Sequence, residues 1–257
     1  MLLLLSPAKT LDYDSPLTTR RFSQPDYLPQ SQQLIERLRH FSPAALAELM
    51  SLSDKLAQLN VGRYADWHTP FTPDNARPAV LAFMGDVYEG LQARQFDDAD
   101  LDYAQQHLRI LSGLYGLLRP LDLIQPYRLE MGTRLDTSAG RDLYAFWGQQ
   151  LAQALDQLAQ AEAPGPIINL ASDEYFKAVP VAALRTPVIQ PVFQDRKNGV
   201  YKIISFHAKR ARGMMARFAI RHRLQHAEAL QGFDEAGYRF APEASSEDRW
   251  LFRREAP

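Results

Sequence analysis

The tripeptide Lys197–Gly199 stands between two runs of strand-forming residues, Val188–Gln194 and Tyr201–Phe206. Asn198 and Gly199 form the strongest short-range signal for a β-hairpin, because both residue types readily take the positive φ of a tight turn. The sequence therefore predicts two antiparallel strands that meet at this turn. A hairpin here requires that the C-terminal half of the chain contributes to a sheet.

Segments with helical periodicity come mainly early in the chain, whereas most strand candidates come later. The expected helices are Ser31–Phe41, Pro43–Asn60, Asp100–Arg109 and Asp142–Gln160. The further expected strands are Val80–Phe83, Pro166–Leu170, Gly237–Ala241 and Trp250–Arg253. Because strands and helices do not alternate regularly, we expect one α+β domain over residues 1–257, with a mixed β-sheet flanked by helices.

The chain begins with an apolar run, Leu2–Leu5, that has no basic residues before it and no small-residue cleavage site after it. We interpret this run as a buried strand and not as an export signal. No apolar run approaches the ~20 residues needed to span a bilayer. We therefore expect a cytoplasmic protein with no membrane partner. The sequence contains no cysteine, which excludes disulfides and thiolate metal sites, and we expect no cofactor and no metal.

The charge of the chain is unevenly distributed. The formal net charge is −1, but residues 196–227 carry nine basic residues and no acidic one, which leaves −10 over the other 225 residues. The nine are Arg196, Lys197, Lys202, Lys209, Arg210, Arg212, Arg217, Arg221 and Arg223. A local positive field of this kind attracts polyanions.

Within this segment, His207–Leu224 has the pattern of an amphipathic helix. Its apolar stripe consists of Met214, Met215, Phe218 and Ala219, and basic residues line both flanks. Such a helix can bury the stripe and present guanidinium groups that bind phosphate in a bidentate manner. Two alternatives stay open, namely a solvated face paired with acids elsewhere in the chain and contact with a membrane surface. The lack of acids within the segment favours binding of nucleic acid or another polyanion.

Two glycines, Gly113 and Gly116, lie between a predicted helix and an apolar segment, with Arg109 and Arg119 on either side. A glycine turn can direct backbone N–H groups towards a phosphate. The pattern resembles a helix-hairpin-helix motif, although two residues separate the glycines instead of one. A buried turn is the alternative.

Three polar strings, Ser6–Thr10, Tyr127–Gly132 and Asn169–Lys177, are bounded by apolar residues. In the last string, Ser172 is predicted to cap a helix that follows a strand. The charged residues of these strings could line one pocket in which an enzyme would place acids, bases and anion-binding groups. The candidate catalytic residues are Lys9, Arg128, Glu130, Glu174 and Lys177. Structural ion pairs are the alternative.

Several strings taken together are more specific than any one of them. They are Ser6–Asp12, Gly85–Tyr88, Leu111–Gly116, Arg119–Asp122, Pro126–Gly132, Asn169–Tyr175 and Ala208–Gly213. In this order they closely resemble the YaaA family of bacterial peroxide-stress-resistance proteins, over essentially the whole chain. The resemblance implies a single α+β domain of unusual fold, with a basic cleft and a helix-hairpin-helix element.

The resemblance also implies a cytoplasmic DNA-binding protein of the hydrogen peroxide response with weak sequence preference, which protects DNA from damage. Binding to duplex or distorted DNA would then rest on phosphate contacts. The expected DNA-binding residues are Arg210, Arg212, Arg217 and Arg221, supported by Lys197, Lys202, Lys209, Gly113 and Gly116. The alternatives are an enzyme that acts on a small anionic or nucleotide substrate in the charged pocket, and a protein that limits free iron. The resemblance carries no assigned reaction, and the sequence does not determine the oligomeric state.

Overall fold

The N-terminal leucines form β1 (Leu2–Leu5), an inner strand of the sheet in a computed structural model that describes residues 1–161 and 163–255. All four leucines are buried, which confirms the prediction. Parallel strands flank β1 on both sides, with β5 (Leu108–Ser112) on one and β8 (Ile167–Asn169) on the other. A parallel strand that has a neighbour on each side and helices over both faces is buried throughout, so its sequence is a continuous apolar run.

The sheet is mixed, as the sequence predicts. Its order is β11 (Arg239–Phe240), β12 (Arg249–Arg254), β9 (Val188–Lys197), β8, β1, β5 and β6 (Gly116–Leu118), and β10 (Val200–Lys202) pairs with β9. The strands from β12 to β5 run parallel to one another, whereas β6, β10 and β11 are antiparallel to their partners. The parallel core places the carboxyl ends of β1 and β8 at one edge.

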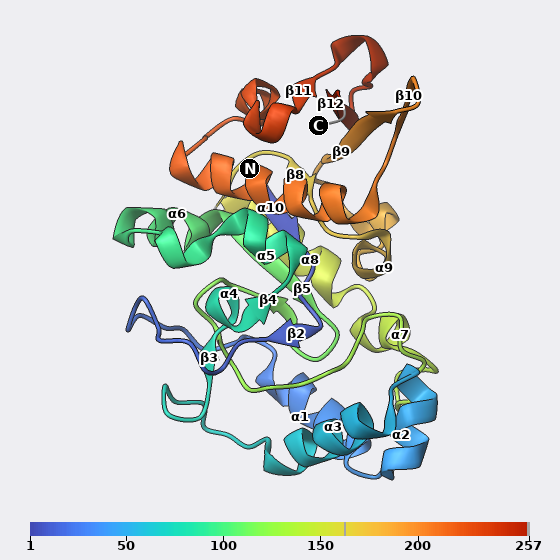
Figure 1. The fold of residues 1–257 in the computed structure, drawn as a ribbon. Helices are drawn as coiled ribbons and strands as arrows, with labels where there is room; N and C mark the ends of the chain where they lie inside the picture. The colour runs from blue at the N-terminus through green and yellow to red at the C-terminus, as the bar shows by residue number, and fades with distance from the viewer. Residues whose placement is uncertain (162, 256–257) are drawn as a thin grey trace.

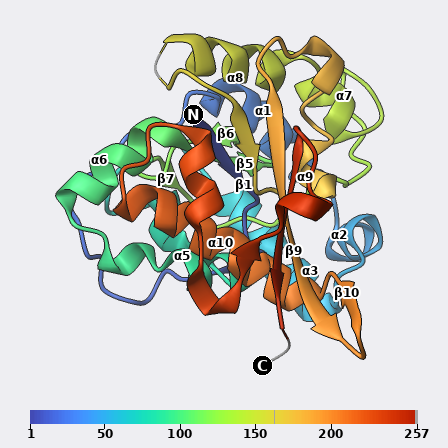
Figure 2. The ribbon, with the colours of Figure 1, turned by 90° about the horizontal axis from the view of Figure 1, so that it is seen from above.

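Helices cover both faces of this sheet (Figures 1 and 2). Helix α8 (Gln150–Ala161) lies on one face and α10 (Ser205–Arg221) on the other, where α10 also packs on α5 (Asp86–Leu91) and α6 (Asp98–His107). The remaining helices are α1 (Leu28–Leu38), α2 (Pro43–Met50), α3 (Asp54–Asp66), α4 (Ala79–Ala82), α7 (Leu143–Trp147) and α9 (Asp173–Phe176). Helices α1 to α3 gather at the end of the molecule opposite to α10 (Figure 1).

Two small sheets and several 3-10 turns complete the fold. The sheets pair β2 (Thr10–Leu11) with β4 (Phe83–Met84) and β3 (Arg77–Pro78) with β7 (Leu123–Ile124). The 3-10 turns are η1 (Ala93–Gln95), η2 (Val181–Ala183), η3 (Ala227–Gly232), η4 (Glu235–Gly237) and η5 (Pro242–Ala244). The predicted strand Val80–Phe83 is wrong, since most of it forms α4 and only its last residue enters β4.

Local signals explain several helix boundaries. The Ser42 hydroxyl accepts a hydrogen bond of 3.2 Å from the Ala45 N–H and so caps α2. Two predicted helices are each broken in two by a residue with positive φ: Ser51 at 52° separates α2 from α3, and Gly148 at 50° separates α7 from α8. The single long helices expected there are therefore incorrect, although both segments are helical.

The predicted hairpin is confirmed. Strands β9 and β10 are antiparallel, with Val200 opposite Lys197, and Asn198 and Gly199 have φ of 55° and 78°. Two positive φ values are what a type I′ turn requires, and its twist matches that of the flanking strands. The second strand is shorter than expected, because α10 already begins at Ser205.

Candidate functional site

The first and last polar strings meet at the carboxyl edge of the parallel strands, immediately after β1 and β8. The Ser172 N–H donates a hydrogen bond of 2.8 Å to the Ser6 hydroxyl, and the two hydroxyl oxygens lie 3.3 Å apart. Ser172 does not cap α9 with its side chain, so that prediction is wrong. Its hydroxyl instead joins the loops that follow two neighbouring strands. Sheets of this kind hold their ligands at this edge.

Three of the five candidate catalytic residues converge on one carboxylate. The Glu130 carboxylate lies 3.0 Å from Lys9 Nζ and 2.7 Å from Arg128 Nη2, and it accepts a further bond of 2.9 Å from Arg128 Nε. Arg128 and Glu130 are mostly covered, whereas Lys9 is exposed. The structure thus brings these three residues into contact. Two cations share the single carboxylate, so that the partly buried Glu130 is paired while the cluster as a whole keeps one positive charge.

The other two candidates lie to one side of this cluster. Glu174 Oε1 accepts a hydrogen bond of 3.0 Å from the Gly132 N–H. The Lys177 ammonium stands 4.8 Å from the centre of the Tyr144 ring, and the Tyr144 hydroxyl donates to the Glu174 carbonyl at 2.9 Å. Within residues 1–161 and 163–255, neither Glu174 nor Lys177 forms an ion pair with the cluster. The structure therefore separates the five residues into two groups.

Buried tyrosines form the wall behind the cluster, and sequence reasoning did not select them. Burial raises the pKa of Tyr88, Tyr127 and Tyr175 well above the ordinary value, so these phenols stay neutral donors. The Tyr88 hydroxyl donates to the Ser6 carbonyl at 3.0 Å. The cavity beside the cluster, which Tyr127 and Tyr175 line, is only about 10 Å³, which is room for about one water molecule. The place of Tyr127 and Tyr175 in the polar strings was the signal that could have identified these two tyrosines.

The last two turns of the basic helix are held by carboxylates from other parts of the chain. Arg217 pairs with Glu235 of η4, and Arg221 lies 2.8 Å from Asp100 of α6, whose side chain is buried. Arg223 adds longer contacts of 3.9 Å to Asp97 and 3.7 Å to Asp100. These arginines therefore anchor the end of α10 to the body of the protein.

Arg196 and Arg212 are also near acids. Arg196 pairs with Glu255 at 3.2 Å. Burial lowers the pKa of Arg212, while the nearby Asp173 carboxylate acts in the opposite direction. Arg212 is half-buried, so it is less exposed than the helical pattern suggested.

Four cations of the basic segment remain open. They are exposed, and none has an ion-pair partner among the residues that the structure describes: Lys197, Lys202, Lys209 and Arg210. We call these four residues the open basic surface. They lie on the β9–β10 hairpin and the first turns of α10, at one side of the molecule (Figure 1).

The glycine turn does not have the predicted form. Gly113 and Gly116 lie in a β-hairpin between β5 and β6 instead of between two helices. Both are buried: a Cβ on Gly113 would overlap the Leu129 carbonyl oxygen, and one on Gly116 would lie 2.7 Å from the Trp147 ring. A covered backbone cannot approach a phosphate. The helix-hairpin-helix interpretation is therefore corrected to the buried turn, because pairing with β1 makes Leu108–Ser112 a strand.

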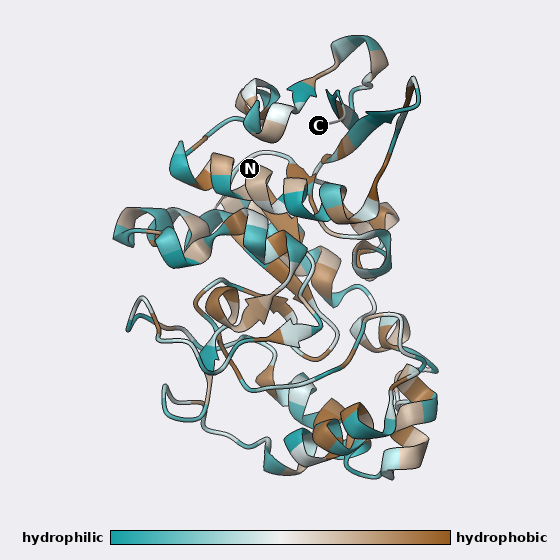
Figure 3. Ribbon diagram, viewed as in Figure 1, coloured by the Kyte–Doolittle hydropathy of each residue, from teal (hydrophilic) through white to brown (hydrophobic). Residues whose placement is uncertain are grey.

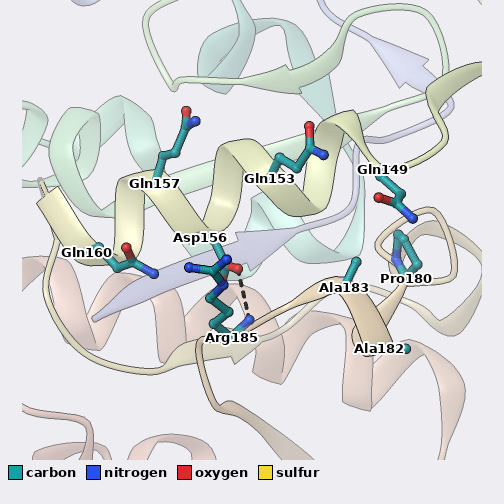
Figure 4. A pocket seen from close by; sticks show the side chains of 9 residues that line it. All are labelled: Gln149, Gln153, Asp156, Gln157, Gln160, Pro180, Ala182, Ala183 and Arg185. Carbon is teal, nitrogen blue, oxygen red and sulfur yellow. Dashed lines mark hydrogen bonds between the residues drawn. The ribbon is translucent and has the colours of Figure 1, made fainter.

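The largest cavity lies away from all of these residues (Figure 4). It measures about 510 Å³ and lies between α8 and the segment that contains η2. Glutamines of α8 line one wall, and Arg185 faces Asp156 across the cavity floor, where the Arg185 N–H donates 2.8 Å to the carboxylate. The Asp156 carboxylate thus already accepts hydrogen bonds from the backbone N–H groups of Arg185 and Thr186.

No group of three or more His, Asp or Glu side chains among residues 1–161 and 163–255 is arranged to hold a metal ion. Within the same residues, no helix combines the length and the apolar character needed to cross a bilayer.

Comparison with known proteins shows similarity to one family over nearly the whole chain. A family model described as "Peroxide stress protein YaaA" matches residues 1–244. A "UPF0246 protein" from Tolumonas auensis is 62% identical over 254 residues, which cover 99% of this chain and 98% of the relative. The similarity thus includes the polar strings, the basic segment and nearly all of the sheet.

Proposed function

This chain belongs to the family of peroxide stress protein YaaA, which indicates a role in oxidative stress, and on that premise we propose that it binds duplex DNA through the open basic surface. The observation that carries the proposal is the division of the basic segment. Carboxylates from elsewhere in the chain hold its C-terminal arginines, whereas Lys197, Lys202, Lys209 and Arg210 face solvent. Cations without an internal partner are free to replace the counterions of a polyanion.

Phosphate contacts determine what kind of binding to expect. Every nucleotide carries the same phosphate, so contacts of this kind position a protein without reading the sequence. Each contact releases condensed counterions, and about four contacts give a slope of log K against log[salt] near −3.6. We therefore expect steeply salt-dependent binding with little difference between unrelated duplexes.

Fluorescence anisotropy with a labelled duplex over a series of salt concentrations tests this proposal. Replacing Lys197, Lys202, Lys209 and Arg210 with alanine should bring the slope close to zero. The control variant replaces four exposed cations that lie elsewhere, Arg20, Lys55, Arg134 and Arg141, with alanine. Both variants lose the same formal charge, so only a local effect separates them. A wild-type slope near zero, or equal losses in both variants, would contradict the proposal.

A further inference from the structure

Three exposed apolar side chains stand among the cations of the open basic surface. Val200, Ile203 and Phe206 are 65%, 53% and 59% exposed. Among the other large hydrophobic residues that the structure describes, only Val181, at 56%, is also more than half exposed. Three such side chains within seven residues form a concentrated apolar feature, and clustered exposed apolar groups mark interaction sites. In Figure 3 the chain that leads from the hairpin tip to α10 is brown beside the teal end of β9.

The fold explains why these residues are not covered. Strand β12 pairs with β9 only as far as Asp195, so the hairpin beyond it extends past the sheet. Tyr201 closes one face of this extension, because its ring lies 4.5 Å from the Arg253 guanidinium and its hydroxyl donates to Glu255 at 3.0 Å. Successive residues of a strand point to opposite faces. Val200 and Lys202 therefore lie on the face away from Tyr201.

We propose that the exposed apolar side chains of this stretch, Val200, Ile203 and Phe206, act as wedges that enter a DNA duplex between neighbouring base pairs. The proposal rests on the DNA binding proposed above and specifies the substrate further. Lys197 lies directly opposite Val200 in the hairpin, and Lys209 follows Phe206 by one helical turn. A two-stranded ribbon fits a groove of DNA, and wedges of Phe, Ile and similar side chains unstack and kink the base step that they enter.

The alternation of charge and apolar side chains favours DNA over a lipid surface. Lysines separate or flank the three wedge residues along the chain, so the apolar groups form no continuous face like that of a helix lying on a membrane. Cations at this spacing instead suit a backbone that carries a phosphate on each side of the base step. The wedge should act best where stacking is already weak, since less free energy is then spent on opening the step.

The experiment compares two short duplexes of the same length, one fully matched and one with a central mismatch, at the same salt concentration. Wild-type protein should bind the mismatched duplex about tenfold more tightly. If the central mismatch contains a thymine, this base should become more reactive towards permanganate when the protein is bound, because permanganate attacks unstacked thymine. Replacing Val200, Ile203 and Phe206 with alanine should bring the affinity ratio close to one and leave the salt slope unchanged. The control variant replaces Phe22, Leu56 and Leu59, which are exposed elsewhere, and should keep the ratio.

The outcomes separate the two proposals. Salt-dependent binding with an affinity ratio of one in wild-type protein would overturn the wedge and leave DNA binding intact. Absence of any salt-dependent binding would overturn both. Binding to phosphatidylserine vesicles that the wedge variant loses, together with a ratio of one, would replace the wedge by a membrane contact. Thermal melting of each variant checks folding, which should be unchanged because the replaced side chains are exposed.

Discussion

The basic segment has two parts that carry similar charge and differ in their surroundings. In the first part, the open basic surface extends on a hairpin and the first turns of α10. In the second part, Arg217, Arg221 and Arg223 meet the carboxylates of α6 and η4. Those carboxylates lie outside the segment, and most of them lie more than 100 residues away. Charge counted along a sequence is therefore not the charge that a partner meets, and four experiments test the division.

The largest effect should come from the contact that fixes the second part to the protein. A Cβ on Gly213 would overlap the Val87 carbonyl oxygen where α10 crosses α5. Gly213→Ala should therefore lower the free energy of unfolding by about 3 kcal/mol, because two backbones must separate. Gly232→Ala is the control, since nothing lies within 4 Å of its added Cβ. Urea denaturation measures both, and equal stability of the two variants would show that the crossing yields readily.

The next effect concerns the buried carboxylate of Asp100, which has Arg221 at 2.8 Å. Arg221→Ala should destabilise the protein by about 2 kcal/mol, less than for a fully buried pair because Arg221 is partly exposed and Arg223 stays nearby. In Asp100→Asn protein the same change should have a smaller effect, since no charge is then left unpaired. Chemical denaturation of the four proteins completes the cycle. If the effects of Arg221→Ala and Asp100→Asn on the free energy of unfolding were additive, Arg221 would have no energetic coupling to Asp100 and would be as unpaired as Lys209.

The charged cluster at the strand ends provides a third comparison, because its two cations also contact a carboxylate, which they share. Glu130→Gln should destabilise the protein by about 1 kcal/mol, since it weakens two charge-assisted contacts at a partly covered site. DNA affinity and survival of cells in peroxide should follow the amount of folded protein. Glu228→Gln, at an exposed residue, is the control. A stable, DNA-competent Glu130→Gln protein that fails to protect cells would make the enzymatic alternative the leading one.

The smallest effect should be on the salt dependence of DNA affinity, with no change in protein stability. Replacing Lys209 and Arg210 with alanine should flatten the slope of log K against log[salt] by about two units and leave the melting temperature unchanged. Replacing Arg217 and Arg221 should flatten it by less than half as much, because carboxylates already neutralise them. Anisotropy titrations of the two double variants make the comparison. Equal slopes would show that DNA displaces the carboxylates and that the whole helix binds.

Local signals in the sequence predicted much of the fold. The Asn198-Gly199 turn and the apolar strand Leu2–Leu5 each depend on a few neighbouring residues, and both are confirmed. The glycine turn at Gly113 was misinterpreted because glycine pairs suit helical and strand hairpins equally. Pairing with β1, about 100 residues earlier, decides between them.

The candidate site could be predicted only in part, because local patterns do not show which distant side chains meet. The sequence suggests that the strings with Lys9, Arg128 and Glu130 could line one pocket, with structural ion pairs as the alternative, and the structure brings these three residues into contact as ion pairs. The sequence did not show that the carboxylate is shared by both cations or that only about 10 Å³ remains beside them. Partners of a charge and the space around it depend on side chains from several elements, which no local pattern contains.

The inner position of β1 also has a consequence for synthesis on the ribosome. Strand β1 is synthesised well before the strands that flank it, since Leu3 pairs with Leu108 and Leu2 with Ile167. Until residue 108 leaves the exit tunnel, a strand of four leucines has both of its hydrogen-bonding edges unsatisfied. Such non-local pairing slows folding and exposes strands that associate with other chains. Nascent chains of this protein should therefore be bound by chaperones while the middle third of the sequence is still being translated.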